Sequence, residues 1–311
     1  MTALLDANLG LLRSPRTRLP LERADGALVT PGEAERYPIV GGVPVLIDAD
    51  ESIVSKLVAE LGPESPIERR QAKGGGAFVK RLLSPTKAET VENIGMFVEA
   101  LKQGNPSPLV LVIGGGTEGQ GTAALYRDPA IRRLSFDIYH SPGIDMVADA
   151  HEIPLADGTV DGVLIQAVLE HVLEPERVVS EIWRVLKPDG VVYAETPFLQ
   201  QVHEGAYDFT RFTESGHRYL FRRFALVRSG PCGGAGTQLL WSLDYFFRGL
   251  FRSRAAGKAA KLAFFWLHWF DRLIPPAHQI DNASGFYLLV RKATTVMSPH
   301  EIVAYYSGAQ R

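Results

Sequence analysis

The stretch LVLVIGGGTEGQGTAAL, residues 109–125, begins as a continuous apolar run, breaks into glycines and then turns polar. An apolar run of this kind is typical of a strand covered on both faces of its sheet. Gly114, Gly116 and Gly119 form a G-x-G-x-x-G pattern at its end, where small residues let a ligand approach the backbone closely. The stretch therefore predicts a buried strand, a glycine loop and a helix, with the loop as a candidate binding site.

The chain beyond this stretch alternates strands with helices. An amphipathic helix is predicted for residues 175–190. One predicted strand ends near Asp137, and three more span residues 144–149, 160–168 and 191–196. This order predicts an α/β fold with a doubly wound, mostly parallel sheet. Ligands of such sheets bind beyond the carboxyl ends of the strands, and the glycine loop lies at such an end.

Composition limits the class of protein. The chain has 311 residues, of which 46% are hydrophobic, enough for a sizeable core in one large domain with additions or in two domains. The formal charge of -2 gives no indication of nucleic-acid binding, which usually shows as a basic excess. Because Cys232 is the one cysteine and no ligand cluster is visible in the sequence, we predict no disulfide within the chain and no metal site.

The N-terminal residues do not resemble a signal peptide, because Asp6, Asn8 and Arg13 interrupt the apolar positions. No window reaches the ~18 uncharged apolar residues of a helix that spans a membrane. We therefore expect a cytoplasmic protein, with a peripheral position at the inner face of the membrane as the alternative.

Residues 147–197, VADAHEIPLADGTVDGVLIQAVLEHVLEPERVVSEIWRVLKPDGVVYAETP, carry ordered motifs. The Asp149-Ala150 pair precedes IPL, a DG-x-x-DGV motif leads into a strand, and E-I-x-R-V-L-K-P-x-G ends a helix. With the glycine loop, these motifs resemble the class I S-adenosylmethionine-dependent methyltransferases over roughly residues 90–230. The resemblance implies a Rossmann-like sheet of seven strands, S-adenosylmethionine as the cofactor, and transfer of a methyl group to an O or N atom.

The resemblance assigns the glycine loop and one carboxylate to the cofactor. Gly114, Gly115 and Gly116 would let the backbone pass close to its methionine part and ribose. Asp137 would accept both ribose hydroxyls, and its position about 20 residues after the loop is the one expected for that role. The loop departs from the usual form by one additional residue, Glu118.

Three further residues complete the implied cofactor site. The side chain of Asp149 would accept from the adenine amino group, the Ala150 amide would donate to a ring nitrogen, and Gln166 would line the methionine end. Many relatives carry an acidic residue in the strand before the glycines, where this chain has Val110 and Val112.

Other interpretations of these motifs stay open. The same glycines could serve an NAD-dependent oxidoreductase, although the motifs after the second strand count against it. The fold could also bind cofactor without catalysis, or serve as an accessory subunit. Taken singly, a glycine cluster can be only a tight turn and an aspartate only a helix cap; the ordered set favours cofactor binding.

The segment TPFLQQVHEGAYDFTRFT, residues 196–213, follows the last predicted parallel strand. The protein mainly aligns the acceptor in a methyl transfer, and an O or N acceptor also has to lose a proton. His203 is the best candidate base because it titrates near neutral pH. Asp208 could orient it and Arg211 could hold an anionic group of the acceptor. Alternatively, Asp208 and Arg211 only pair with each other. For His171 a structural role is expected.

The first residues, 1–61, form a small β-rich segment whose YPIVGGVPVLI stretch resembles a zinc ribbon, as in the small activator subunit of some tRNA and protein methyltransferases. The usual form has two C-x-x-C pairs. Here Ser14 and Thr17 replace the first pair, and Thr30 and Glu33 the second. Zinc needs thiolate or imidazole ligands, so we predict a ribbon-like segment without zinc.

The remaining chain is divided into a charged, glycine-rich linker at residues 62–80 and a methyltransferase domain at residues 81–300. Within that domain, residues 239–274 are rich in Trp and Phe with interleaved Arg and Lys. Such a stretch can lie on a bilayer surface, cover an apolar acceptor as a lid, or form a dimer face. Two ordinary helices at the sheet edge are the alternative. We expect a small or lipid-like acceptor, and the oligomeric state stays open.

Overall fold

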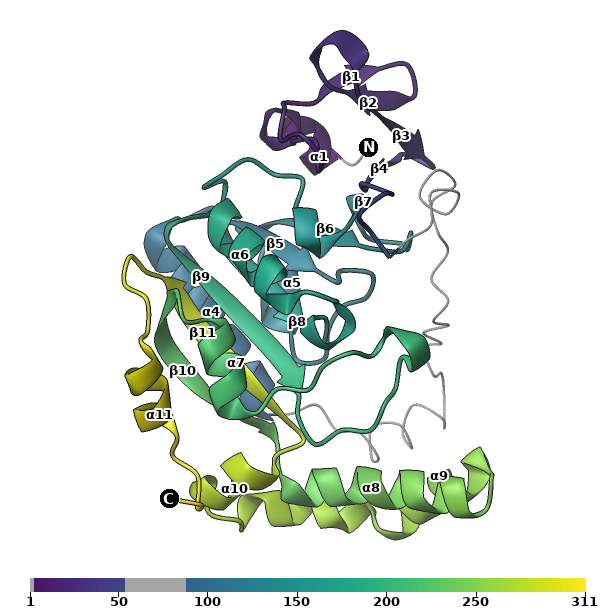
Figure 1. The fold of residues 1–311 in the computed structure, drawn as a ribbon, viewed down its shortest axis with the longest axis vertical. Coiled ribbons are helices and arrows are strands. Elements are labelled where there is room, and N and C mark those ends of the chain that lie inside the picture. The colour runs from purple at the N-terminus through teal and green to yellow at the C-terminus, as the bar shows by residue number, and fades with distance from the viewer. Residues whose placement is uncertain (1–2, 54–87) are drawn as a thin grey trace.

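The computed structural model of the chain describes residues 3–53 and 88–311 (Figure 1). The predicted linker at residues 62–80 lies outside these described residues.

The centre of the molecule is a seven-stranded sheet in the order β7-β6-β5-β8-β9-β11-β10. Five neighbouring strands are parallel: β5 (Leu109–Ile113), β6 (Arg132–Asp137), β7 (Met146–Ala148), β8 (Val160–Gln166) and β9 (Leu186–Pro197). The last two, β10 (Phe224–Gly233) and β11 (Gly285–Lys292), are antiparallel. The strand order reverses at β5, so the glycine loop that follows β5 lies at the switch point of the sheet.

Helices cover both faces of this sheet, as predicted for a doubly wound fold (Figure 1). Alternate residues of β5 face opposite sides: Leu111 packs with the apolar face of α6 (Pro175–Val185), and Val110 packs with that of α4 (Ala88–Gly104). The remaining helices beside the sheet are α5 (Ala123–Arg127) and α7 (Glu214–Leu220). The buried residues of β5 therefore explain its continuous apolar run.

The helix predicted for residues 175–190 ends earlier, at Val185. The next residue, Leu186, already lies opposite Val160 in the parallel pairing of β9 with β8. Asp189, with a positive φ, lies where the pairing of β9 with β8 shifts register between Val160 and Gly162. Strand pairing at the sheet thus ends the helix before Pro188 is reached.

The N-terminal segment extends the sheet to eleven strands. Its last strand pairs in parallel with β7, with Val45 opposite Val147 and Leu46 opposite Ala148. Its elements are α1 (Ala3–Ala7), β1 (Glu22–Ala24), β2 (Ala27–Val29), β3 (Arg36–Val40) and β4 (Val43–Leu46). The predicted β-rich segment is therefore joined edge to edge with the main sheet.

The chain before β11 forms a group of helices at the end of the molecule opposite the N-terminal strands (Figure 1). They are α8 (Ala235–Leu250), α9 (Arg254–Ala263), the 3-10 helix η6 (Phe265–Arg272) and α10 (Pro276–Asn282); α11 (Pro299–Tyr305) follows the sheet. Asp271 accepts hydrogen bonds from the backbone N–H groups of Gly236 and Thr237 and so caps α8. None of the helices in the described part of the chain is long and apolar enough to cross a membrane.

Candidate functional site

The glycine loop packs tightly against the ends of the neighbouring strands. A Cβ on Gly115 would lie 2.7 Å from Cβ of Ser135, and one on Gly116 would lie 2.7 Å from Oδ2 of Asp137. Gly114 has a φ of 76°, which L side chains rarely adopt. Side chains are therefore excluded here for both steric and conformational reasons, and the backbone of the loop is the surface that a ligand would meet.

Asp137 ends β6 and lies against this loop. Its Oδ2 accepts from the Gly116 N–H at 3.2 Å, and its Oδ1 accepts from the Tyr139 N–H at 3.3 Å. Backbone groups on both sides therefore fix the orientation of the carboxylate. The side chain is only partly buried, so its position fits the predicted ribose contact, which stays a prediction.

Asp149 follows β7, at the predicted adenine position, but its carboxylate already has partners. Oδ1 accepts from the N–H of His151 and contacts its Nδ1 at 2.5 Å, while Oδ2 accepts from the Ser52 hydroxyl at 2.5 Å. The residue is 3% exposed. Burial opposes ionisation, but the hydrogen bonds from His151 and Ser52 outweigh it and lower the pKa of Asp149. An adenine amino group would share the carboxylate with Ser52 and His151, and the predicted acceptor role stays a prediction.

The next residue, Ala150, is buried and begins a short 3-10 helix that ends at Glu152. The Glu174 N–H donates to Nε2 of His151 at 3.2 Å, so Nδ1 of that ring carries the proton shared with Asp149. This network fixes the turn in which Ala150 lies. Its predicted contact with the adenine ring stays a prediction.

Gln166 ends β8 on the other side of the glycine loop. Its Nε2 donates to Glu195 at 2.7 Å, while its Oε1 is buried without a hydrogen-bond partner among the described residues. The hydroxyl of Ser141, also buried and without a partner there, would lie 2.7 Å from a Cβ on Gly116. Buried polar atoms normally have partners. Two such atoms beside one glycine loop fit a polar ligand such as S-adenosylmethionine.

The predicted catalytic residues lie together in the loop after β9. The His203 N–H donates to Oδ2 of Asp208 at 2.9 Å, and the Nδ1 of His203 lies 3.3 Å from the same atom. Arg211 donates to both carboxylate oxygens of Asp208. Burial opposes ionisation, but the bonds from Arg211 and the His203 N–H outweigh it and lower the pKa of Asp208 to about 2. Asp208 therefore stays a carboxylate that positions His203.

Arg211 is committed within its own loop. Besides Asp208, it donates to the carbonyl oxygens of Gln200 and Gln201 at 3.0 and 3.2 Å. The ion pair between Asp208 and Arg211 is the alternative to a catalytic role that the sequence analysis left open. The predicted contact of Arg211 with an anionic acceptor stays a prediction that would require some of these bonds to be exchanged.

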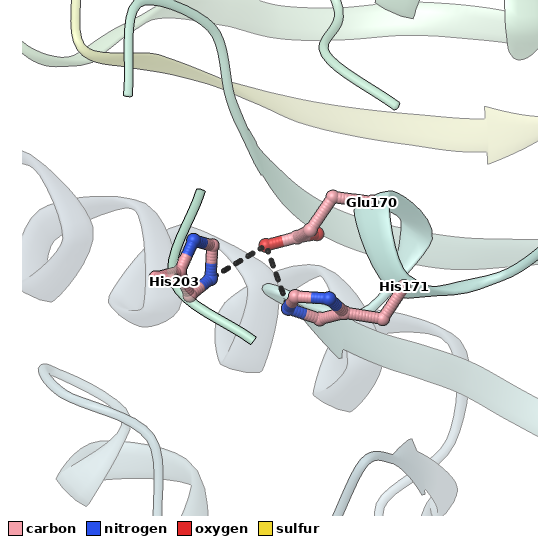
Figure 2. Close-up of side chains that lie close together, drawn as sticks. All are labelled: Glu170, His171 and His203. Carbon is pink, nitrogen blue, oxygen red and sulfur yellow. Dashed lines mark ion pairs between the residues drawn. The ribbon is translucent and has the colours of Figure 1, made fainter. Parts of the chain in front are cut away.

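Figure 2 shows a cluster that the sequence did not predict, formed by Glu170, His171 and His203. Oε1 of Glu170 lies 3.7 Å from Nε2 of His171 and 4.0 Å from Nε2 of His203. The two imidazoles meet edge to face, with ring centroids 4.9 Å apart. Glu170 is 1% exposed, and burial raises the pKa of its carboxyl to about 8. His171 thus has a defined place beside His203 rather than only in helix packing.

A signal for this cluster was present in the sequence. Glu170 and His171 follow β8, and His203 follows β9. The carboxyl ends of neighbouring parallel strands lie at the same edge of a sheet, so the segments that follow β8 and β9 lie at one edge. A comparison of the polar residues that follow neighbouring strands would have placed Glu170, His171 and His203 in one cluster.

The positions where the zinc-ribbon resemblance would place ligands hold a hydrogen-bonded polar cluster. Ser14 Oγ accepts from the Thr17 N–H at 3.0 Å and pairs with the Tyr37 hydroxyl at 3.1 Å. Thr17 donates to Glu35 at 3.0 Å, and the Glu35 N–H donates to Thr30 at 3.0 Å. Glu33 makes a backbone bond to Thr30. The zinc-ribbon interpretation stays a prediction; the hydrogen bonds show what joins these turns here.

The helices α8, α9 and η6, with the residues directly after them, expose several large apolar side chains. Trp269 is 59% exposed and Leu273 is 74% exposed. Others in this region are exposed too: Leu239, Phe246, Leu250, Phe251, Leu262, Trp266 and Phe270. We call this set the aromatic face. This exposure fits a lid, a membrane contact or a dimer face, and the choice between these roles and ordinary helices at the sheet edge stays a prediction.

The comparisons with known proteins bear on the centre of this site. Residues 122–194 match the family model of a methyltransferase domain. The match begins after the glycine loop and includes Asp137, Asp149 and Gln166. Together with the strand order, it confirms the predicted Rossmann-like class I methyltransferase fold. At the level of this domain it also supports the predicted methyltransferase activity and the S-adenosylmethionine cofactor.

Two solved structures illustrate the fold. One is a SAM dependent methyltransferase from Archaeoglobus fulgidus, with 13% identity, 69% of this chain and 98% of that chain covered, and a TM-score of 0.43. The other is Haemonchus contortus phosphoethanolamine N-methyltransferase 2 in complex with S-adenosyl-L-methionine. It has 14% identity and a TM-score of 0.42, and the match covers 73% of this chain and 59% of that chain. At these scores neither likeness bears on the acceptor. No curated protein matches the chain.

Proposed function

We propose that the protein is an S-adenosylmethionine-dependent methyltransferase that acts on an O or N atom of a small or lipid-like acceptor. The observation that carries the proposal is the convergence of the glycine loop, Asp137 and Gln166 at the switch point of the sheet. Two buried polar atoms beside them have no hydrogen-bond partner in the part of the chain that the structure describes. The domain match over the same strands supports it.

Two groups of residues have separate proposed roles, one in binding the cofactor and one in binding the acceptor. The loop of Gly114, Gly115 and Gly116 and the carboxylate of Asp137 would hold the cofactor, with Gln166 at its methionine end. S-adenosylmethionine supplies, when bound, a methyl group on a sulfonium with a good leaving group. The acceptor has to be aligned and to lose a proton. The cluster of Glu170, His171 and His203 faces the same edge, and we place the acceptor there.

The first experiment is calorimetric titration of the purified protein with S-adenosylmethionine, S-adenosylhomocysteine and NADH side by side. Binding of the first two and not of NADH is expected. Binding of NADH alone would favour the oxidoreductase, and binding of none would favour a non-catalytic protein. Turnover of bound cofactor to S-adenosylhomocysteine with an acceptor would exclude a role in binding alone.

Ser52→Ala is expected to bind S-adenosylmethionine about fivefold more tightly, because one hydrogen bond that competes for Oδ2 of Asp149 is removed, at about 1 kcal/mol. Calorimetry on wild type and variant measures the change. Ser307→Ala, at an exposed position far along the chain, is the matched control. Weaker binding by Ser52→Ala would show that Ser52 supports the adenine site rather than competing for it.

We further propose that the aromatic face contacts an anionic membrane surface. The charged side chains exposed beside it are basic: Arg252, Arg254, Lys258 and Arg272. Apolar and basic groups on one helical surface are what a peripheral membrane contact requires. The face is also joined to the candidate acceptor site, because Tyr245 of α8 donates to the Val202 carbonyl at 3.0 Å, next to His203. A lipid-like acceptor fits this arrangement.

Sedimentation with phosphatidylglycerol-containing vesicles tests this contact. The double variant Trp269→Ser, Leu273→Ser is expected to bind the vesicles at least about tenfold more weakly than the wild-type protein. The reason is that it removes two exposed apolar side chains from the contact. Val303→Ser is the control, since Val303 is 79% exposed on α11, outside the aromatic face. Concentration-dependent dimerisation that the double variant abolishes, without vesicle binding, would identify a dimer face instead.

A further inference from the structure

The two imidazoles of the cluster present lone pairs to one carboxylate. Nδ1 of His171 lies 2.6 Å from the Tyr207 carbonyl oxygen, which can only accept, so this nitrogen carries the ring proton. Nδ1 of His203 faces Asp208 and the Gln201 carbonyl oxygen, which also accept. In the neutral rings both Nε2 atoms are therefore unprotonated, and each faces Oε1 of Glu170 at a distance too long for a hydrogen bond.

The side chain of Glu170 accepts a hydrogen bond from its own backbone N–H, but protein groups satisfy it only in part. Oε2 of Glu170 is buried and has no hydrogen-bond partner among the described residues. Ionising this buried carboxyl without a cation beside it is costly, and two unprotonated imidazole nitrogens face it as well. A cation at the point where they meet would compensate all three at once.

The geometry is close to that of a metal centre. The three ligand atoms lie within 4.8 Å of one another. Two ligands of a tetrahedral ion with bonds of about 2.0–2.1 Å lie about 3.4 Å apart, so small rotations of the side chains would bring the three onto one ion. His203 is on a loop and its side chain is 25% exposed, so a small rotation of the ring can keep its contact with Asp208 while Nε2 moves toward the ion.

The surroundings supply the outer contacts that metal-binding histidines usually have. Such a histidine donates its other N–H to a carboxylate or a backbone carbonyl, which fixes the ring and its tautomer. His203 has Asp208 in this position and His171 has the carbonyl of Tyr207. Asp208 is itself held by Arg211.

Although the sequence predicted no metal site, we propose that Glu170, His171 and His203 form a binding site for a divalent transition-metal ion of the zinc class. Two imidazoles and one carboxylate with a free position are the ligand set of catalytic zinc and non-haem iron(II) sites. Magnesium and calcium prefer oxygen ligands alone. This site goes beyond the proposed function, since ion binding does not require methyl transfer.

An ion at this position has a defined use. It would lie at the carboxyl ends of β8 and β9, four residues from Gln166, where we place the acceptor. Its free position would bind an acceptor oxygen and lower the pKa of that hydroxyl, so that the proton leaves to water or to a nearby base before methylation. The ion would thereby favour hydroxyl or catechol-like acceptors over amines.

The test is ion binding by the full chain without an affinity tag, after dialysis against a chelator. Titration with Zn²⁺ in a weakly chelating buffer is expected to show one ion per chain, and Co²⁺ is expected to give visible absorption typical of nitrogen and oxygen ligands. Absence of saturable binding of both ions, or binding of Mg²⁺ in their place, would overturn the proposal.

Variants locate the ion. Glu170→Gln keeps the shape of the side chain and is expected to weaken Zn²⁺ binding at least tenfold. Asp208→Asn changes the outer contact of His203 together with the pairing to Arg211, and it is expected to weaken Zn²⁺ binding by about 10–100-fold. His300→Asn, at an exposed position on α11, should leave it unchanged. Thermal unfolding of each variant shows whether the fold is intact. His203→Ala, on the exposed loop, is a second ligand variant and is expected to weaken Zn²⁺ binding without loss of folding. Equal binding by all variants would place the ion elsewhere.

Discussion

His203→Ala is expected to slow methyl transfer by about 10²–10⁴-fold, the range for loss of a group that assists proton transfer. The side chain lies in the cluster with Glu170 and His171, and Asp208 holds it there. None of its contacts involves the glycine loop or Asp137. The affinity for S-adenosylmethionine should therefore change by less than about twofold.

The measurement is the initial rate of S-adenosylhomocysteine formation with a hydroxyl or amine compound that the wild-type protein methylates. His300→Ala is the matched control because it removes an exposed imidazole far from the cluster. Asp208→Asn should give a smaller loss, because it keeps the imidazole and removes the charge that orients it and pairs with Arg211. A normal rate in His203→Ala would move the acceptor away from the cluster.

The central sheet could be predicted from the sequence because its determinants are local. The run from Leu109 to Ile113 is apolar at every position, and the structure buries all five residues. The strand ends at Asp137 and Gln166 were predicted to within a few residues for the same reason. The motifs between strands carried the remaining information, since their order distinguishes this fold from other doubly wound sheets.

Contacts between distant segments could not be predicted in this way. Ser52 and Asp149 are far apart in sequence, and nothing near either residue indicates their hydrogen bond. The parallel pairing of β4 with β7 likewise depends on the exposed edge of a short strand. Both contacts arise from one feature, the docking of the N-terminal segment on that edge, which brings Ser52 to the end of β7.

The end of helix α6 shows how tertiary pairing overrides a local signal. Pro188 and Gly190 favour a helix end near residue 190, yet Leu186 already belongs to β9. The aromatic face is the opposite case. Its composition was visible in the sequence, but only the structure shows that Trp269 and Leu273 point outward and that α8 holds the loop of His203.

Asp137→Ala is expected to weaken S-adenosylmethionine binding by on the order of 1–3 kcal/mol, which corresponds to roughly 5–150-fold. A carboxylate can accept from both ribose hydroxyls, and hydrogen bonds to a charged group are the stronger kind. Asp137 is already oriented by the N–H groups of Gly116 and Tyr139, so little ordering is left to be done when the ribose binds. Asp137→Asn, with one accepting oxygen, should lose less.

Calorimetric titration of the two variants and of Asp25→Ala, an exposed aspartate in the turn between β1 and β2, measures these differences. Thermal unfolding controls for loosening of the glycine loop, since Asp137 also accepts from Gly116. Unchanged affinity in Asp137→Ala would remove the ribose assignment. Loss of affinity in Asp137→Ala with full affinity in Asp137→Asn would show that one hydrogen bond to the ribose is enough and that the charge contributes little. A graded loss from Asn to Ala is the result that a carboxylate bound to both hydroxyls requires.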